Sequence, residues 1–162
     1  MKRIYNRKTL LKLLQEKMHS SGYVHATCFP VDPWRIAREE GIEVVVCPLG
    51  TVTGMLYSDR WLTRIRLDSN VRSLARRRYT LMHELIHYWF HPPGTYFELP
   101  GTETSIYEIQ ANHGAAEALM PDWAVKEVGT SLGYDVGRLA QTFGVSRKAM
   151  EIRLEKLGIR TA

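Results

Sequence analysis

The chain has 162 residues, of which 44% are hydrophobic and 24% are charged. This balance is typical of a globular protein and excludes the disordered and fibrous classes, and the length suits one domain with a proper core. The net charge of +5 permits an acidic partner such as nucleic acid. It does not require one, because the excess charge is spread along the chain.

The two cysteines, Cys28 and Cys47, are too few for a disulfide framework. We expect them to be reduced, partly buried thiols in a cytoplasmic protein. The N-terminal segment is basic but has no uninterrupted apolar run, because Lys12 divides its leucines. It predicts an amphipathic helix packed on the domain, and neither a signal peptide nor a membrane span.

The first half of the chain predicts two helices and a small sheet. Leucines at helical spacing indicate a helix over about residues 6–20. Asp32 as N-cap and Pro33 at the first helical position begin a second helix, which Gly41 ends. The β-branched run IEVVVCP predicts a buried strand, and the segments TGMLYSD and WLTRIRLD predict a hairpin beside it, with its turn at residues 58–60. We therefore expect three strands.

The second half is mainly helical. A helix from Ser73 to Phe90 ends at Pro92–Pro93, and a loop rich in Gly, Pro and Thr leads to a second strong helix from Ser105 to Met120. Shorter helices are expected around residues 121–129, 135–142 and 146–157. This order is typical of the α+β class. We expect a single domain over residues 1–162, made of an N-terminal helix and connector (1–30), a core (31–130) and a C-terminal helical segment (131–162).

The segment HELIHYWFH, residues 83–91, contains the H-E-x-x-H pattern inside a predicted helix. His83 and His87 lie about 40° apart around the helix and about 6 Å apart along it, so their imidazoles can converge on one metal ion. Glu84 flanks the same face, where a general base toward an attacking water is needed. The opposite face is apolar and is predicted to join the core.

His91 is predicted to be a helix-end residue rather than a third ligand. It lies about 12 Å from His83 along the axis, and it directly precedes Pro92, where helical geometry is disfavoured.

The third ligand must therefore come from another segment. Glu108 and Asn112 share one face of the helix in IYEIQANHGAAEALMP. Glu108 can complete a His₂Glu set, and Asn112 can orient a ligating histidine by accepting its free N–H. Three protein ligands leave one position open, as in a catalytic zinc site. The set favours zinc, although manganese or iron bind the same ligand types.

Other carboxylates are weaker candidates. Glu98 and Glu103 lie in or beside the predicted loop and have no helical partner. Glu117 is on the face of its helix opposite Glu108, and we expect it, like His113, to lie on a solvated surface. Small residues beside Glu108, Ala111 and Ala116, are expected to allow the two helices to approach closely.

Four blocks of the chain, in order, resemble the ImmA/IrrE-type metallopeptidase family: VDPWRIAREEGIEVVV, RRRYTLMHELIHYWFH, YEIQANHGAAEALMP and VSRKAMEIRLEKLGI. The resemblance implies a compact zincin-like fold, in which the small sheet packs on the active-site helix and a second ligand-bearing helix. By position it implies His83, His87 and Glu108 as zinc ligands and Glu84 as the catalytic glutamate. It also implies cytoplasmic proteolysis of helix-turn-helix repressors, often in phage, mobile elements or stress responses. The PPGTYFELPG loop and His91 are not part of the resemblance.

Two alternatives to a repressor-cleaving endopeptidase remain. The segment LAQTFGVSRKAMEIRLEKLGI also fits a helix-turn-helix whose second helix carries Arg147, Lys148 and Arg153. The basic residues Arg72 and Arg76–Arg78 suit either phosphates or the acidic groups of a substrate. A third hypothesis is a regulator that binds a repressor without cleaving it. The intact Glu84 favours the enzyme.

Overall fold

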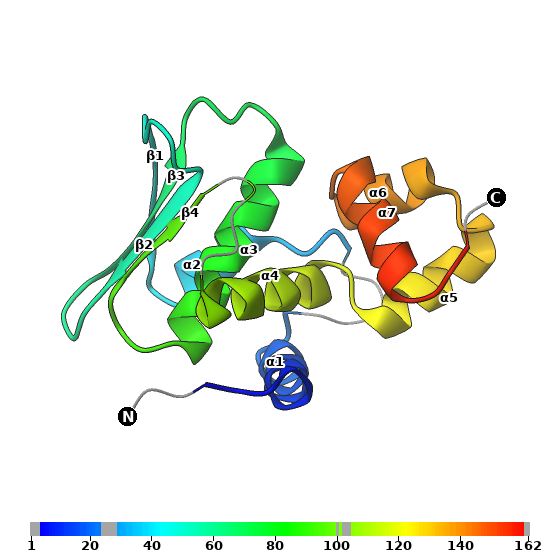
Figure 1. The fold of residues 1–162 in the computed structure, drawn as a ribbon, viewed down its shortest axis with the longest axis horizontal. Helices are drawn as coiled ribbons and strands as arrows, with labels where there is room; N and C mark the ends of the chain where they lie inside the picture. Colours follow the sequence, from blue (N-terminus) through cyan, green and yellow to red (C-terminus); the bar gives the residue numbers. More distant parts are fainter. Residues whose placement is uncertain (1–3, 24–28, 100, 102–104, 161–162) are drawn as a thin grey trace.

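The computed structural model describes residues 4–23, 29–99, 101 and 105–160. Within these residues the chain forms helices and strands in the order expected of an α+β protein (Figure 1). The helices are α1 (Arg7–Ser20), α2 (Pro33–Glu39), α3 (Leu74–Phe90), α4 (Ile106–Leu119), α5 (Asp122–Leu132), α6 (Val136–Phe143) and α7 (Arg147–Lys156). The strands are β1 (Glu43–Cys47), β2 (Gly54–Ser58), β3 (Thr63–Asp68) and β4 (Thr95–Glu98).

Side-chain caps fix where the main helices begin, which confirms the predicted boundaries to within a residue or two. Asn6 and Asp32 cap α1 and α2 by accepting backbone N–H groups of the first turn. Ser73 and Ser105 do the same for α3 and α4. An N-cap oxygen satisfies an N–H that has no partner within the helix, so these short polar residues specify the starts locally.

The sheet has four strands, one more than predicted, in the order β1-β3-β2-β4. β2 and β3 form the predicted hairpin, and β1 pairs with β3 in parallel. The additional strand, β4, was predicted to be part of the Gly/Pro-rich loop. Its four residues pair antiparallel with β2, from Tyr57↔Thr95 to Gly54↔Glu98. This pairing partner lies far away in sequence, so local patterns did not reveal it.

The sheet and the C-terminal helices lie at opposite ends of the molecule, with α3 and α4 between them (Figure 1). Leu56, Ile65 and Leu67 on the sheet are buried in one cluster with the apolar face of α3. Gly54 lets the sheet come close to α3: a Cβ there would collide with the methyl group of Thr80 and lie 3.0 Å from Glu84 Oε1. The start of β2 thus packs directly against the middle of α3.

Helices α3 and α4 cross in close contact. A Cβ on Gly114 would lie 2.9 Å from the Ile86 side chain, tighter than ordinary packing allows. Ala111, Ala115 and Ala118 are buried on the same helix. Of the two alanines expected at this contact, Ala111 is buried and Ala116 is only partly buried, while Gly114 lies directly against Ile86.

The prediction that Glu117 lies on a solvated surface is wrong, since its exposed fraction is 5%. Its carboxylate accepts hydrogen bonds from Arg153 of α7 and from Gln15 of α1. Arg153 is equally buried and also donates to the carbonyl of Met120 at 2.9 Å. The pattern of one helix cannot show that two other helices will cover its polar face. This ion pair fastens α7 to the end of α4.

No helix among the described residues combines the length and the apolar character needed to cross a membrane. Cys47 is a free, partly buried thiol, as expected. Cys28 lies outside the described residues.

We expect Arg153→Met to lower the free energy of unfolding by about 3–5 kcal/mol, because it leaves the Glu117 carboxylate buried without its charged partner. Chemical denaturation of the purified chain measures this. The double variant Glu117→Gln/Arg153→Met should recover part of the loss. Equal stability of Arg153→Met and the unmodified chain would contradict the role assigned to the pair.

Candidate metal centre

Helix α3 presents His83, Glu84 and His87 from consecutive turns in its buried half. Leu81, Leu85 and Ile86 occupy the apolar face and are fully buried. The helix therefore has a fixed rotation about its axis, which directs both histidines toward α4. The exposed fractions of His83, Glu84 and His87 are 0%, 0% and 1%, so all three polar side chains are held away from bulk solvent.

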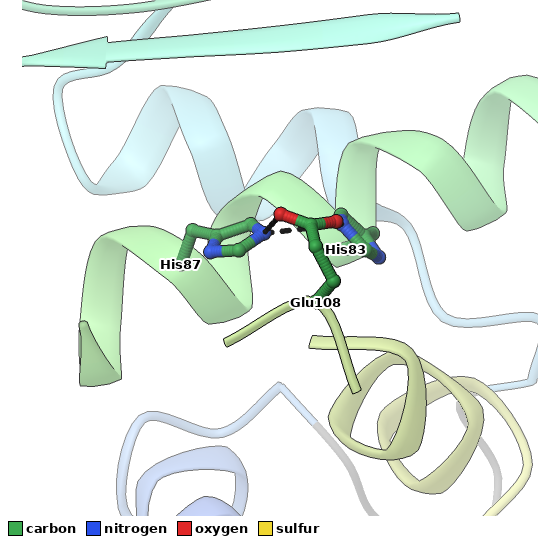
Figure 2. Close-up of side chains that lie close together, drawn as sticks. All are labelled: His83, His87 and Glu108. Carbon is green, nitrogen blue, oxygen red and sulfur yellow. Dashed lines mark hydrogen bonds and ion pairs between the residues drawn. The ribbon is translucent and has the colours of Figure 1, made fainter. Parts of the chain in front are cut away.

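Glu108 reaches both histidines from the first turn of α4 (Figure 2). One carboxylate oxygen lies 3.0 Å from His83 Nε2, and the other lies 3.2 Å from His87 Nε2. The two Nε2 atoms are 3.1 Å apart. In a tetrahedral zinc site with bonds of about 2.0–2.1 Å, neighbouring ligand atoms stand about 3.3 Å apart. His83, His87 and Glu108 together can hold a metal ion, and their spacing fits a tetrahedral one.

Asn112 lies one turn after Glu108 and contacts the far side of His83. Its Oδ1 is 3.0 Å from His83 Nδ1. If Nε2 is the atom turned toward the metal, Nδ1 carries the proton and donates it to Asn112. Asn112 thus contacts the ring nitrogen of His83 that faces away from Glu108.

His91 has a more specific position than the sequence indicated. It is the C-cap of α3, with a non-helical backbone, as predicted for a helix-end residue. It is also buried, and its Nδ1 lies 2.8 Å from His87 Nδ1. Its Nε2 lies 3.0 Å from Gln110 Oε1, and the amide of Gln110 donates to the carbonyl of Tyr5.

These contacts form a chain in which every hydrogen bond has one donor and one acceptor. Because Gln110 donates its amide to Tyr5, its Oε1 accepts the Nε2–H of His91. His91 Nδ1 then accepts the Nδ1–H of His87, which leaves His87 Nε2 to face Glu108. Burial, with a smaller effect of His87, lowers the pKa of His91 to about 4, so its ring is neutral and can accept. The sequence reasoning missed Gln110. Its spacing from Glu108 gave no signal, because it reaches His91 only through the end of α3.

The side chain of Glu84, on α3, lies beside Gly54 of β2. Both of its carboxylate oxygens are buried and have no hydrogen-bond partner among the described residues. Burial raises its pKa to about 8; His83 opposes this shift, while Glu98 and Glu108 add to it. A buried carboxylate without a partner is expensive.

Among the described residues, the rival carboxylate Glu98 is not part of the group of candidate ligands. Glu98 accepts from Thr53 Oγ1 at 3.0 Å and lies 3.8 Å from Arg76, so it belongs to the sheet edge. Glu103 lies outside the described residues. Burial opposes ionisation of Glu108, but its hydrogen bonds with His83 and His87 outweigh this and lower its pKa to about 2. Glu108 is therefore the ionised carboxylate of the group.

A small sheet on an H-E-x-x-H helix, with a carboxylate supplied by a second helix, defines the class of zincin-like metallopeptidase domains. The chain belongs to the Peptidase_M78 family, whose profile, described as the IrrE N-terminal-like domain, matches residues 37–155. The resemblance seen in the sequence is confirmed.

Two relatives place this assignment in context. "Uncharacterized immunity region protein 2" of Bacillus phage phi105 is 33% identical over 100 residues, which cover 59% of this chain and 63% of the phage protein. A solved structure of a Mycobacterium tuberculosis transcriptional regulator matches 91% of this chain with a TM-score of 0.63 and 17% identity. The chain spans only 47% of that regulator. At this identity the similarity shows a shared fold.

We expect His91→Phe to weaken zinc binding about 10–100-fold, because the phenyl ring fills the space but cannot accept the His87 Nδ1–H. Competition with a zinc-binding dye measures the affinity directly. His19→Phe, on the exposed side of α1, is the matched control and should leave the affinity unchanged. A zinc affinity of His91→Phe equal to that of the control would show that His91 only packs.

Proposed function

We propose that this protein is a zinc-dependent endopeptidase that cleaves a peptide bond in a partner protein. The observation that carries the proposal is the combination of three converging ligand atoms and an unpaired glutamate on the same helix. The edges of the His83, His87 and Glu108 triangle suit a tetrahedral ion. Glu84 is the buried carboxylate without a partner among the described residues. Membership of a metallopeptidase family supports this assignment.

In this proposal His83, His87 and Glu108 hold the ion, and Asn112 and His91 keep the two rings in the required tautomer. A zinc ion bound there supplies Lewis acidity toward a water molecule and a peptide carbonyl. Glu84 acts as the general base: it accepts a proton from the attacking water and passes it to the departing amine nitrogen. The buried position of Glu84 favours this task, since a carboxylate without hydrogen bonds retains its full proton affinity.

The partner we propose is a helix-turn-helix transcriptional repressor, whose cleavage relieves repression. The matched phage protein carries the name of an immunity region, and the matched solved structure is named a transcriptional regulator. The second name belongs to transcriptional control. A cytoplasmic location follows from such a partner.

The DNA-binding alternative has less support than the sequence suggested. Arg153, one of its three basic residues, is buried in the ion pair with Glu117. Arg77 and Arg78 donate to the backbone carbonyls of Ser69 and Gly144. These three side chains make contacts within the protein, so they are less available to bind phosphates.

Glu84→Gln should lower the rate of cleavage about 10²–10⁴-fold, the usual contribution of general acid–base catalysis, and leave zinc affinity nearly unchanged. The test is co-expression with the transcription factor encoded beside this protein, followed by detection of its fragments. Glu127→Gln, an exposed residue of α5, is the control. Cleavage that persists in Glu84→Gln, or no cleavage by the zinc-loaded unmodified protein, would refute the peptidase.

Removal of metal by a chelator should abolish cleavage, and added zinc should restore it. Zinc at 100 times its dissociation constant should also raise the free energy of unfolding by about 2.7 kcal/mol, because the ion binds only the folded state. Thermal melting at increasing zinc concentration measures this without an assay of activity. The stabilisation should persist in Glu84→Gln and vanish in His83→Ala. A melting temperature independent of zinc would contradict the metal site.

A further inference from the structure

A cleft of about 700 Å³ connects the candidate metal centre with the C-terminal helix α7. His83, Glu108 and Asn112 line it at the metal centre, and Lys148, Ile152 and Lys156 are among the residues that line it on α7. The volume is in the range of specific ligand pockets. The helix that looked like a DNA-recognition helix in the sequence is therefore a wall of the same cleft.

The buried face of α7 is distinct from the row of residues that the helix shows to the cleft. Met150, Arg153 and Leu154 are buried and attach the helix to the rest of the fold. Lys148, Ile152 and Lys156 follow one another at intervals of four residues, so they form one row along the helix. We call these three residues the α7 row.

The α7 row makes little contribution to the fold. Ile152 remains 39% exposed although it is a large apolar residue. The Lys148 side chain is 78% exposed, and its ion pair, at 3.8 Å, is with Glu151 of its own helix. Lys156 has no ion pair within the part of the chain that the structure describes. Such side chains are available to an occupant of the cleft.

The two arginines that line the cleft each have an ion-pair partner within the protein. Arg76 pairs with Glu98, and Arg153 pairs with Glu117. Lys148, whose partner Glu151 is 3.8 Å away on its own helix, and Lys156 contribute positive charge to the α7 end of the cleft, with the apolar side chain of Ile152 between them. Leu99, itself 39% exposed, also lines the cleft. An occupant that combines negative charge with an apolar group is complementary to this surface.

The spacing of the α7 row indicates the form of that occupant. Residues four apart on a helix are separated by about 6 Å along its axis, and alternate residues of an extended chain are about 6.6–6.8 Å apart on one face. An extended peptide can therefore place three alternate side chains opposite the three members of the row.

We propose that the α7 row selects the substrate segment next to the cleaved bond, and that this segment is extended and reads acidic–any–apolar–any–acidic. The inference rests on the proposed endopeptidase function, since the cleft leads to the candidate metal centre. Lys148 and Lys156 face the two carboxylates, and Ile152 contacts the apolar side chain. The occupant is a peptide rather than a nucleic acid, because the row has an apolar centre.

The first test measures binding to the zinc-loaded full chain by fluorescence anisotropy, with three labelled nine-residue peptides as probes. One has a central leucine with glutamates two positions away on each side. The second has glutamines in those places, and the third has the glutamates moved next to the leucine. We expect the first peptide to bind about tenfold more tightly than the other two, the gain available from two accessible ion pairs.

The variant Lys148→Gln/Lys156→Gln should bind the three peptides equally, and Ile152→Asn should weaken the first peptide while its preference over the second persists. Lys8→Gln/Lys12→Gln removes the same charge from exposed positions of α1 and should behave like the unmodified protein. Melting temperatures of all variants show that they remain folded. Equal binding of the three peptides to the unmodified protein, or an equal effect of the α1 control, would overturn the inference.

The second test separates this inference from the proposed function by following cleavage of the same peptides with a quenched fluorophore. A preference for the first peptide that lies in KM and is lost in Lys148→Gln/Lys156→Gln supports both. Preferential binding without any cleavage supports the α7 row and refutes the peptidase. Cleavage without preference refutes the α7 row alone. A 20-base-pair DNA duplex that displaces the first peptide and requires the two lysines would also overturn the inference, in favour of nucleic acid.

Discussion

The close approach of α3 and α4 is the constraint on which the candidate site depends. Gly114 and the buried alanines of α4 allow Ile86 to pack almost against the α4 backbone. Only at this separation does the short carboxylate of Glu108 reach the Nε2 atoms of His83 and His87 at 3.0 and 3.2 Å. A larger residue at position 114 would separate the helices, and the three ligand atoms would no longer fit one ion.

The candidate ligands at this contact have hydrogen-bond partners that hold them in place. Asn112 and His91 each accept from a different histidine, so both rings expose Nε2 to the same point. Glu108 is held ionised by those rings. Both carboxylate oxygens of Glu84 lack a hydrogen-bond partner within the described structure, as does the hydroxyl of Thr80 beside it. A buried carboxylate without a hydrogen bond lowers the free energy of unfolding, and such groups occur mainly at functional sites.

The position of α7 depends on a second buried contact. Glu117 is satisfied by Arg153 of α7 and Gln15 of α1, so helices from both ends of the chain meet at the end of α4. This contact turns one face of α7 inward and leaves Lys148, Ile152 and Lys156 along the cleft. A segment that resembles a helix-turn-helix in the sequence thus becomes part of the wall beside the candidate metal centre.

Local patterns in the sequence were sufficient for most elements. Polar caps at Asn6, Asp32, Ser73 and Ser105 fixed the helix starts, and the spacing of His83, His87, Glu108 and Asn112 identified the group that the fold brings together. These signals are readable because a cap or a helix face involves residues within one or two turns.

Three features depend on contacts between distant segments and were visible only in the tertiary structure. It added β4 to the sheet, since a strand at an edge is defined by its distant partner β2. It buried Glu117, and it brought His91 and Gln110 together from α3 and α4. The sequence by itself determined that His83 and His87 share one helix face and that Glu108 and Asn112 share another, because the periodicity of a helix face is local. The separation of α3 and α4 and the rotation of α7 depend on contacts between distant segments, and only the folded chain decided them.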